Sequence, residues 1–470
     1  MPSLPRARGL SLLWVVLLCE RAAHFGLRVG FQRGFDHVGL DHGIGSSAQA
    51  SFTLLAPLLA LGSLPLTVVA DRYLGRQRAV LAGAALATLG GAFLMLGVPV
   101  AWSMAFIIVG HAGVRAIVLS LVGDLHGRGD PRRDAAFVWI GLAGWLGAST
   151  GAILGSLIGA GGTTIVAYLL AAVLFVARQP ELPAEGFSAD AEGAPRAALS
   201  LADARAIGAA VLAGAGAAFA LQMLMNLFVS APALTFGVAA LGIALAITAG
   251  LLIRDRFYLH RSAPPLGALA WQRIGVLALL GALVLAAEVG SGRVTGDVLG
   301  ANLGLFTAQT ALAMGFATLA GTIVVALVVR RLDDAPGPPS GVTKIVAGVL
   351  LQAAALGLVA LAPAVAPLAI VALVLRGLGE VVLVAVGLSL VSKLAPPRYA
   401  AFAMACWSLA ALLGGTFAGA LGGASALDGA IALGLAVVAG LLAALAPRLR
   451  ALMGGAEDLP AEAPAPGPYR

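Results

Sequence analysis

The feature that most constrains this sequence is a succession of long apolar runs separated by short polar connections. Two sets of six runs lie near residues 9–31, 48–70, 79–98, 101–123, 135–158 and 163–178, and near residues 272–291, 300–329, 344–362, 366–391, 398–421 and 428–446. Two further runs lie between the sets, near residues 204–227 and 232–253. A helix of about 20 apolar residues crosses the hydrocarbon core of a bilayer. The runs therefore predict an all-α polytopic membrane protein with about fourteen transmembrane helices.

Composition and loop charges limit the function further. The chain is 60% hydrophobic and 11% charged, which is typical of a membrane protein, and its formal net charge is +7. Lysine and arginine lie mainly in alternate connections between the runs. Because cytoplasmic loops are enriched in these residues, we expect both termini in the cytoplasm and no nucleic-acid partner. The two cysteines lie inside apolar runs, so neither a disulfide framework nor a cysteine metal motif is predicted.

The order of the runs predicts four regions. Residues 1–178 are expected to form an N-terminal six-helix bundle, and residues 262–450 a C-terminal six-helix bundle. Residues 179–261 are expected to form a polar cytoplasmic linker followed by the two extra transmembrane helices. Residues 451–470 are rich in Ala, Pro and Glu, which predicts a disordered cytoplasmic tail.

Charged residues inside the apolar runs indicate the position of a site. A charge at bilayer depth costs about 2.5 kcal/mol or more, so it is expected to face a protein interior or a watery cavity. The embedded charges occupy the first and fourth runs of both sets: Glu20, Arg21, Arg28 and Arg115, with His111 one turn before Arg115, then Glu288, Arg376 and Glu380. Matching positions in two halves are typical of a duplicated transporter with its site at the midplane between the halves.

These charges are also consistent with a purely structural interpretation. Glu20 and Arg21 would then form a fixed pair that joins helices. Arg376 would neutralise Glu380, which follows it by one helical turn. A histidine such as His111 is more often packed in an interior than used as a proton carrier. The residue types alone leave both interpretations open for Glu20, Arg21, Arg376 and Glu380.

The sequence lacks the signatures of common enzymes and of ATP-driven pumps. It contains no HExxH motif, no Walker-type glycine loop and no nucleophile elbow. The connection from Asp36 to His42 contains two Asp and two His residues, but a solvated loop is favoured there over a metal site. We therefore expect a protein that is not an enzyme, holds no metal or cofactor, and draws any uphill transport from an ion gradient.

Three stretches resemble the proton-dependent oligopeptide transporters, a family of the major facilitator superfamily. Asp71-Arg-Tyr-Leu-Gly-Arg76 is similar to the Asp-Arg-x-x-Gly-Arg loop between the second and third helices of that family. Asp130-Pro-Arg-Arg-Asp-Ala-Ala-Phe137 resembles the loop before its fifth helix. The stretch from Gly377 to Pro396, followed by Ala403-Met-Ala-Cys-Trp407, is similar to its tenth and eleventh helices. The resemblance implies the major facilitator fold and a bacterial inner membrane location.

The resemblance also implies roles for individual residues. The implied proton-coupling residues are Glu20 and Arg21, which match the end of the ExxER motif, and Glu288. The implied substrate-binding residues are the cations Arg28 and Arg115 for the carboxylate of a peptide, Glu380 for its amino group, and Trp407 near the cavity. The implied gating loop contains Asp71, Arg72, Gly75 and Arg76.

Some positions depart from the family pattern. Leu17 replaces the first Glu of ExxER, which removes one titratable site, and His24 follows where the family has a tyrosine. His24 is a candidate replacement for the lost acid because histidine titrates near neutral pH. Arg376, one turn before Glu380, is a candidate neutralising partner of the amino-group receptor.

The leading hypothesis is a monomeric secondary transporter that couples the uptake of di- or tripeptides to protons. It would work by alternating access of two six-helix halves in a lipid membrane. The first alternative is a diverged member that moves another small solute, such as an organic anion, because the embedded arginines outnumber the embedded glutamates. The second alternative is a carrier-like membrane sensor that does not transport.

Overall fold

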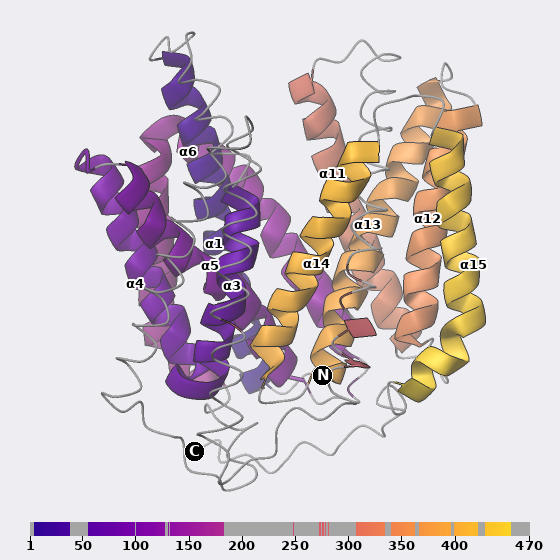
Figure 1. Cartoon of the computed structure of the whole chain (residues 1–470), viewed down its shortest axis with the longest axis horizontal. Helices are drawn as coiled ribbons and strands as arrows, with labels where there is room; N and C mark the ends of the chain where they lie inside the picture. Colours follow the sequence, from indigo (N-terminus) through magenta and orange to yellow (C-terminus); the bar gives the residue numbers. More distant parts are fainter. Residues whose placement is uncertain are drawn as a thin grey trace, which may run out of the picture. The chain divides into compact units, whose positions relative to one another are not determined.

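The described part of the chain consists of helices. The computed structural model describes residues 4–37, 55–98, 100–126, 130, 132–182, 307–333, 340–361, 366–395, 399–421 and 428–452, with isolated positions between 248 and 281. Its α-helices are α1 (Leu4–His37), α3 (Leu55–Val69), α4 (Arg76–Met95), α5 (Val100–Asp124), α6 (Arg132–Arg178), α11 (Thr307–Asp333), α12 (Gly341–Leu361), α13 (Ala366–Leu394), α14 (Ala400–Leu421) and α15 (Asp428–Leu452) (Figure 1). A π-helical turn, η1 (Ala70–Leu74), and a 3-10 turn, η2 (Gln179–Glu181), complete the described elements. The predicted all-α class is confirmed.

Most predicted spans coincide with described helices. Both sets of six are represented, by α1 to α6 and by α11 to α15. Six helices in the described part are long and apolar enough to cross a membrane. The predicted runs 204–227 and 232–253, and most of 272–291, lie outside the described residues, so the total of fourteen helices remains a prediction. The predicted tail 451–470 also lies almost entirely outside them.

α6 contains two predicted spans, 135–158 and 163–178, in one helical element. The element is 47 residues long and changes direction at Gly159, where φ is 74° and ψ is 178°. Only glycine adopts this conformation without strain, because it has no Cβ. The short stretch Gly159-Ala-Gly-Gly162 therefore acts as a kink where the sequence predicted a connection between two helices.

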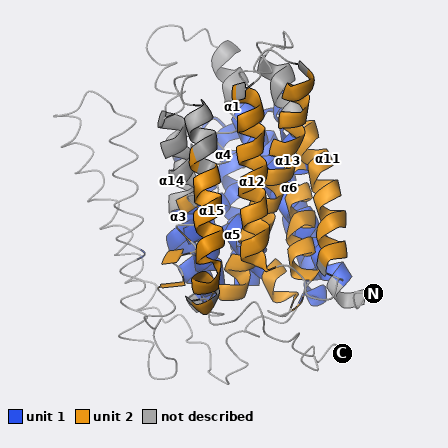
Figure 2. Ribbon diagram, turned by 90° about the vertical axis from the view of Figure 1, so that its right-hand side faces the viewer, with its two compact units in different colours: residues 1–121, 146–267, 396–409 blue, residues 122–145, 268–395, 410–470 orange. Residues whose placement is uncertain are grey.

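The chain divides into two compact units (Figure 2). Unit 1 contains residues 1–121, 146–267 and 396–409, and unit 2 contains residues 122–145, 268–395 and 410–470. Borders fall inside α5, α6 and α14, so each unit includes a short segment from the other predicted half. Unit 1 includes the start of α14, and unit 2 includes the end of α5 with the start of α6. The division at residues 178 and 262 remains a prediction.

Each unit has its own apolar packing. In unit 1, Leu27 of α1 packs against Ile107 and Ala112 of α5. In unit 2, α12 packs against both α13 and α15, and α11 packs against α13. Small residues such as Ala355 and Ala372 lie in the α12–α13 contact, which lets the helix backbones approach closely.

The outer surface of the described helices is strongly apolar. Large side chains such as Trp102, Leu157 and Val173 are 65%, 72% and 63% exposed. Many large apolar side chains exposed along such helices are unfavourable in water and are matched by lipid. The exposed side chains and the length of the helices together indicate a multi-pass membrane protein.

Candidate functional site

The charge pair of the first span lies inside unit 1. Glu20 of α1 is completely buried. Its neighbour Arg21 donates from Nε to Oε2 at 2.8 Å and from Nη2 to Oε1 at 3.2 Å. Such a two-point contact between guanidinium and carboxylate is a strong, directional form of ion pair. The predicted proton-coupling residues Glu20 and Arg21 are therefore in direct contact.

A histidine from α5 binds the same carboxylate. Nε2 of His111 lies 2.9 Å from Oε1 of Glu20. Nδ1 of His111 is hydrogen-bonded to the hydroxyl of Tyr168 on α6. His111 and Tyr168 are 5% and 1% exposed, so the chain Glu20–His111–Tyr168 joins three helices in the interior of unit 1.

His24, the predicted replacement for the acid lost at Leu17, lies beside this chain. Its ring stacks on that of His111 with 5.3 Å between centroids and 21° between planes. Its Nδ1 is buried and has no hydrogen-bond partner in the described part of the protein. His24, His111 and Tyr168 line one small crevice of unit 1, together with Ala23, Leu27, Ile107 and Thr164. Leu17 itself is buried and apolar.

A glycine stripe on α6 sets the position of α1. Gly147, Gly151 and Gly155 repeat every four residues, which places them on one face of the helix. A Cβ added at any of them would collide with α1 backbone, at Leu18, Ala22 and Gly26 respectively. Small residues at this spacing let two membrane helices approach to backbone contact. The stripe therefore fixes the helix that carries Glu20, Arg21, His24 and Arg28.

The predicted carboxylate-binding cations lie on α1 and α5. Arg28 is on an exposed face of α1, and Arg115 is half-buried on α5, one turn after His111. Arg115 is close enough to Glu20 for an electrostatic interaction. Trp407 is 4% exposed in the α14 segment of unit 1. Glu288 lies outside the described residues.

The predicted amino-group receptor lies in unit 2. Nη1 of Arg376 is 3.2 Å from Oε2 of Glu380 on α13, and the hydroxyl of Thr318 on α11 donates to the same oxygen at 3.3 Å. Glu380 and Arg376 are 3% and 7% exposed. Gln352 of α12 donates to the carbonyl oxygen of Arg376 at 3.1 Å. In this structure the carboxylate of Glu380 is therefore paired with Arg376.

The predicted gating loop has an unusual backbone. The π-turn η1 closes with a bond from the amide of Gly75 to the carbonyl oxygen of Ala70 at 3.0 Å, and Gly75 has a φ of 86°. This left-handed conformation lets the chain leave η1 and begin α4 at once. The turn presents Asp71, whose Oδ1 accepts from Nε of Arg76 at 2.7 Å and whose Oδ2 accepts from the amide of Phe402 at 3.0 Å. Asp71 thereby holds the start of α14, and the side chain of Arg72 lies outside the described residues.

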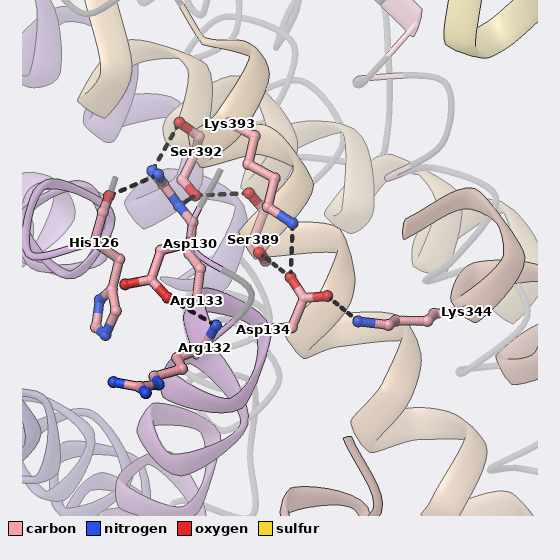
Figure 3. Close-up of polar contacts among 9 residues, drawn as sticks. All are labelled: His126, Asp130, Arg132, Arg133, Asp134, Lys344, Ser389, Ser392 and Lys393. Atoms are coloured by element: carbon pink, nitrogen blue, oxygen red, sulfur yellow. Dashed lines mark hydrogen bonds and ion pairs between the residues drawn. The ribbon is translucent and has the colours of Figure 1, made fainter. Parts of the chain in front are cut away.

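A second polar cluster surrounds the first turn of α6 in unit 2 (Figure 3). The carboxylate of Asp134, 2% exposed, accepts from Nζ of Lys344 on α12 and from the hydroxyl of Ser389 on α13. Nζ of Lys393 on α13 is 3.1 Å from its Oδ1. The neighbouring Arg133 donates to the hydroxyl of Ser392 at 2.7 Å and to its carbonyl oxygen at 2.9 Å. We call Asp134, Lys344, Lys393 and Ser389 the Asp134 cluster.

The Asp134 cluster was not predicted from the sequence. Lys344 and Lys393 stand at the ends of apolar runs, where the sequence alone gives only a signal of membrane orientation. The signal available in the sequence was Asp134 itself, an acid that follows two arginines and precedes an apolar run. More than 200 residues separate Asp134 from its partners in the sequence, so its pairing depends on the tertiary packing of α6 against α12 and α13.

Comparisons with known proteins agree with the resemblance seen in the sequence. The chain is 29% identical over 164 residues to the uncharacterized transporter YclF of Bacillus subtilis, which is 32% of this chain and 31% of that protein. It is 30% identical over 136 residues to the peptide transporter YePEPT of Yersinia enterocolitica, which is 27% of each chain. The similarity thus spans less than a third of either curated relative. No protein-family model matches the chain.

Solved structures match nearly the whole chain. A crystal structure of a peptide transporter POT in complex with sulfate matches with a TM-score of 0.62 and 23% identity, over 95% of this chain and 96% of that one. The human organic anion transporter MFSD10 matches with a TM-score of 0.60 and 18% identity, over 96% and 100%. The chain is a multi-pass membrane protein that shares the all-helical fold of these solved transporter structures.

Proposed function

We propose that the protein is a secondary transporter that couples di- or tripeptide uptake to protons by alternating access. The observation that carries this proposal is a buried carboxylate paired with arginine in both predicted halves, Glu20 with Arg21 and Glu380 with Arg376. Buried charges in membrane spans are costly and usually serve transport or proton movement. The peptide transporters among the sequence relatives and solved structures support the same substrate class.

In the proposed cycle, each of these ion pairs can break so that its charged side chains bind the substrate instead. A proton from outside would neutralise one acid and release its guanidinium to bind the carboxylate of the peptide. Arg28 and Arg115 would provide further cations for that carboxylate, with Trp407 beside them, and Glu380 would accept the amino group. Glu288 would provide a second proton-coupling acid. A zwitterionic peptide is complementary to one cationic wall and one anionic wall.

Two polar contacts support alternating access. Asp71 from the N-terminal half binds the amide of Phe402 in the C-terminal half, and Asp134 from the N-terminal half binds Lys344 and Lys393 in the C-terminal half. Each contact joins segments of the two predicted halves, so the halves can separate at these points only when the contacts break. The loop from Asp71 to Arg76 is proposed to gate this step.

The proposal includes the membrane and the driving force. Alternate arginine-rich connections favour both termini in the cytoplasm, and the bacterial relatives favour a bacterial inner membrane location. The protein would act as a monomer in lipid, with protons and a small solute as its partners and no other cofactor.

Glu380→Gln is expected to abolish proton-driven accumulation of dialanine. The amide keeps the size of the side chain but provides no anion for the peptide amino group or for Arg376. The measurement is uptake of radiolabelled dialanine into proteoliposomes that are acidic outside and negative inside. Wild-type uptake should exceed equilibration and collapse with a protonophore, and the variant should show background uptake.

A control and a contrary outcome complete this test. Thr318→Val removes only the hydroxyl that donates to Glu380, so it should reduce uptake far less. Both variants must elute as monodisperse protein at wild-type yield. A Glu380→Gln variant that accumulates dialanine like the wild type would exclude Glu380 from the site.

A second candidate is transport of another small solute, such as an organic anion. The observation that favours it is the ion pair that already occupies Glu380, because a neutralised acid attracts a peptide amino group less strongly. One matching structure is that of an organic anion transporter. Competition of dialanine uptake by an anion panel separates the candidates. Absence of dialanine uptake by folded protein, with uptake of an anion, would favour this second function.

A further inference from the structure

Both ring nitrogens of His111 have a polar partner, and the two partners differ in kind. Nε2 faces the carboxylate of Glu20, which only accepts hydrogen bonds, and Nδ1 faces the hydroxyl of Tyr168, which both donates and accepts. A neutral His111 must therefore carry its proton on Nε2, toward Glu20, and accept at Nδ1 from the Tyr168 hydroxyl. This arrangement fixes the tautomer of the neutral ring.

The same arrangement can accept a proton without moving a heavy atom. When a proton binds Nδ1, the ring becomes a donor at both nitrogens, and the hydroxyl of Tyr168 rotates from donor to acceptor. The Nε2–H bond to Glu20 is kept and becomes a bond between two opposite charges. The proton adds to the ring and no other bond forms or breaks.

The charges around His111 determine what this protonation changes. In the described part of unit 1, the charged or titratable groups around it are Glu20, Arg21 and His24 on α1, Arg115 on α5 and Tyr168 on α6. α3 contacts α5 near Gly113 and contains no charged residue, and the stretch of α4 beside Gly110 contains none either. Glu20 is the one carboxylate among these described groups, so His111, Arg21 and Arg115 all interact with the same carboxylate.

We propose that His111 is the side chain that receives the coupling proton, that Tyr168 fixes its tautomer, and that its protonation loosens Glu20 from Arg21. This proposal rests on the proposed proton-coupled function and places its titrating group on α5. A protonated His111 supplies Glu20 with a second cation, so the guanidinium of Arg21 is held less tightly and becomes available to an anionic group. Leu17 leaves α1 without one titratable side chain, and His111 on the neighbouring helix α5 provides a titratable side chain in its place.

The first readout is protonation of His111 itself, which requires no substrate. The protein contains six histidines, and full-length protein with ¹⁵N-labelled histidine in nanodiscs would give a small set of ring signals. The signal lost in His111→Gln identifies this residue. We expect that signal to report the Nε2–H tautomer while the ring is neutral and the doubly protonated form once the coupling proton is bound. Tyr168→Phe should allow the second tautomer of the neutral ring.

The second readout is proton-driven uptake, with His126→Gln as the control and His24→Gln as the competing variant. His24 stacks on His111 but is not hydrogen-bonded to Glu20. We expect His111→Gln to reduce dialanine accumulation to equilibration while counterflow of dialanine persists. His126→Gln should keep accumulation, because Nδ1 of His126 lies 3.4 Å from the carbonyl oxygen of Val122 and outside the chain Glu20–His111–Tyr168. Tyr168→Phe should shift the pH profile of accumulation, which a purely structural role would not do.

The outcomes separate this proposal from the proposed function. If the wild type does not transport dialanine but the His111 signal reports both the neutral and the doubly protonated ring, the proposed peptide transport is wrong and the proposed proton site is supported. If dialanine is accumulated but the His111 signal never reports the doubly protonated ring, the proton site is elsewhere. Loss of accumulation in His24→Gln, with retention in His111→Gln, would overturn the proposal in favour of His24.

Discussion

Asp134→Asn is expected to destabilise the protein by about 3–5 kcal/mol. Asp134 is a buried anion that binds the ammonium groups of Lys344 and Lys393 and the hydroxyl of Ser389. Removing one partner of a buried ion pair leaves the other charge without compensation, and this loss typically has the stated size. An amide retains the shape of the side chain, so the change isolates its charge. The measurement is unfolding of purified protein in detergent by heat or denaturant.

Two further variants test this prediction: a control substitution at Asp130, and a second substitution at Lys344 that should restore stability. Asp130 lies four residues earlier, is half-buried, and accepts a backbone bond from Arg132 at 3.0 Å. Asp130→Asn should change stability by less than about 0.5 kcal/mol, as most surface substitutions do. Adding Lys344→Met to Asp134→Asn should recover part of the loss, because it removes a charge left unpaired. Equal losses for Asp130→Asn and Asp134→Asn would contradict a specific role of the buried carboxylate.

Gly151→Leu is expected to separate α1 from α6 and to abolish both stable folding and any transport. A Cβ at this position would collide with the backbone of Ala22, which has no flexible side chain to move aside. Overpacking usually lowers the free energy of unfolding by about 1–3 kcal/mol. We expect a collision with backbone atoms to lower it by at least the upper value of that range. The shift would also displace Glu20 and Arg21, which flank the contact. The measurement is monodispersity and thermal stability of the purified variant.

A glycine on the same helix is the matched control for this prediction. Gly141 is helical, and a Cβ there would meet no atom within 4 Å. Gly141→Ala should leave stability unchanged or raise it by up to about 1 kcal/mol, because alanine favours a helix more than glycine. Gly151→Ala should fall between Gly141→Ala and Gly151→Leu. A stable Gly151→Leu variant would show that α1 and α6 are not held by this contact.

The helices and the local charge pairs were predictable from the sequence because both depend on short-range spacing. Apolar runs of about 20 residues specify membrane helices whatever surrounds them. Glu20 and Arg21 are adjacent, and Arg376 and Glu380 are one turn apart, so a helix brings each pair together. The resemblance to peptide transporters also depended on short stretches, such as the loop from Asp71 to Arg76.

The partners of the buried acids could not be predicted in this way. His111 is buried, as expected of an interior histidine, but its partners Glu20 and Tyr168 lie on two other helices and could not be read from the sequence. Asp134 binds lysines from helices that begin about 200 residues later. Periodicity within a helix gives the face of a side chain but not the helix that this face meets.

The sequence alone thus determined the helical class, the membrane environment and the pairs that form within one helix, since each follows from the spacing of apolar and charged residues along the chain. Tertiary structure decided that α1 lies against the glycine stripe of α6, which brings Glu20 to His111, and that the first turn of α6 lies between Lys344 and Lys393. Helix contacts depend on shape complementarity between distant segments, and a carboxylate in an apolar interior binds whichever cations that packing brings to it.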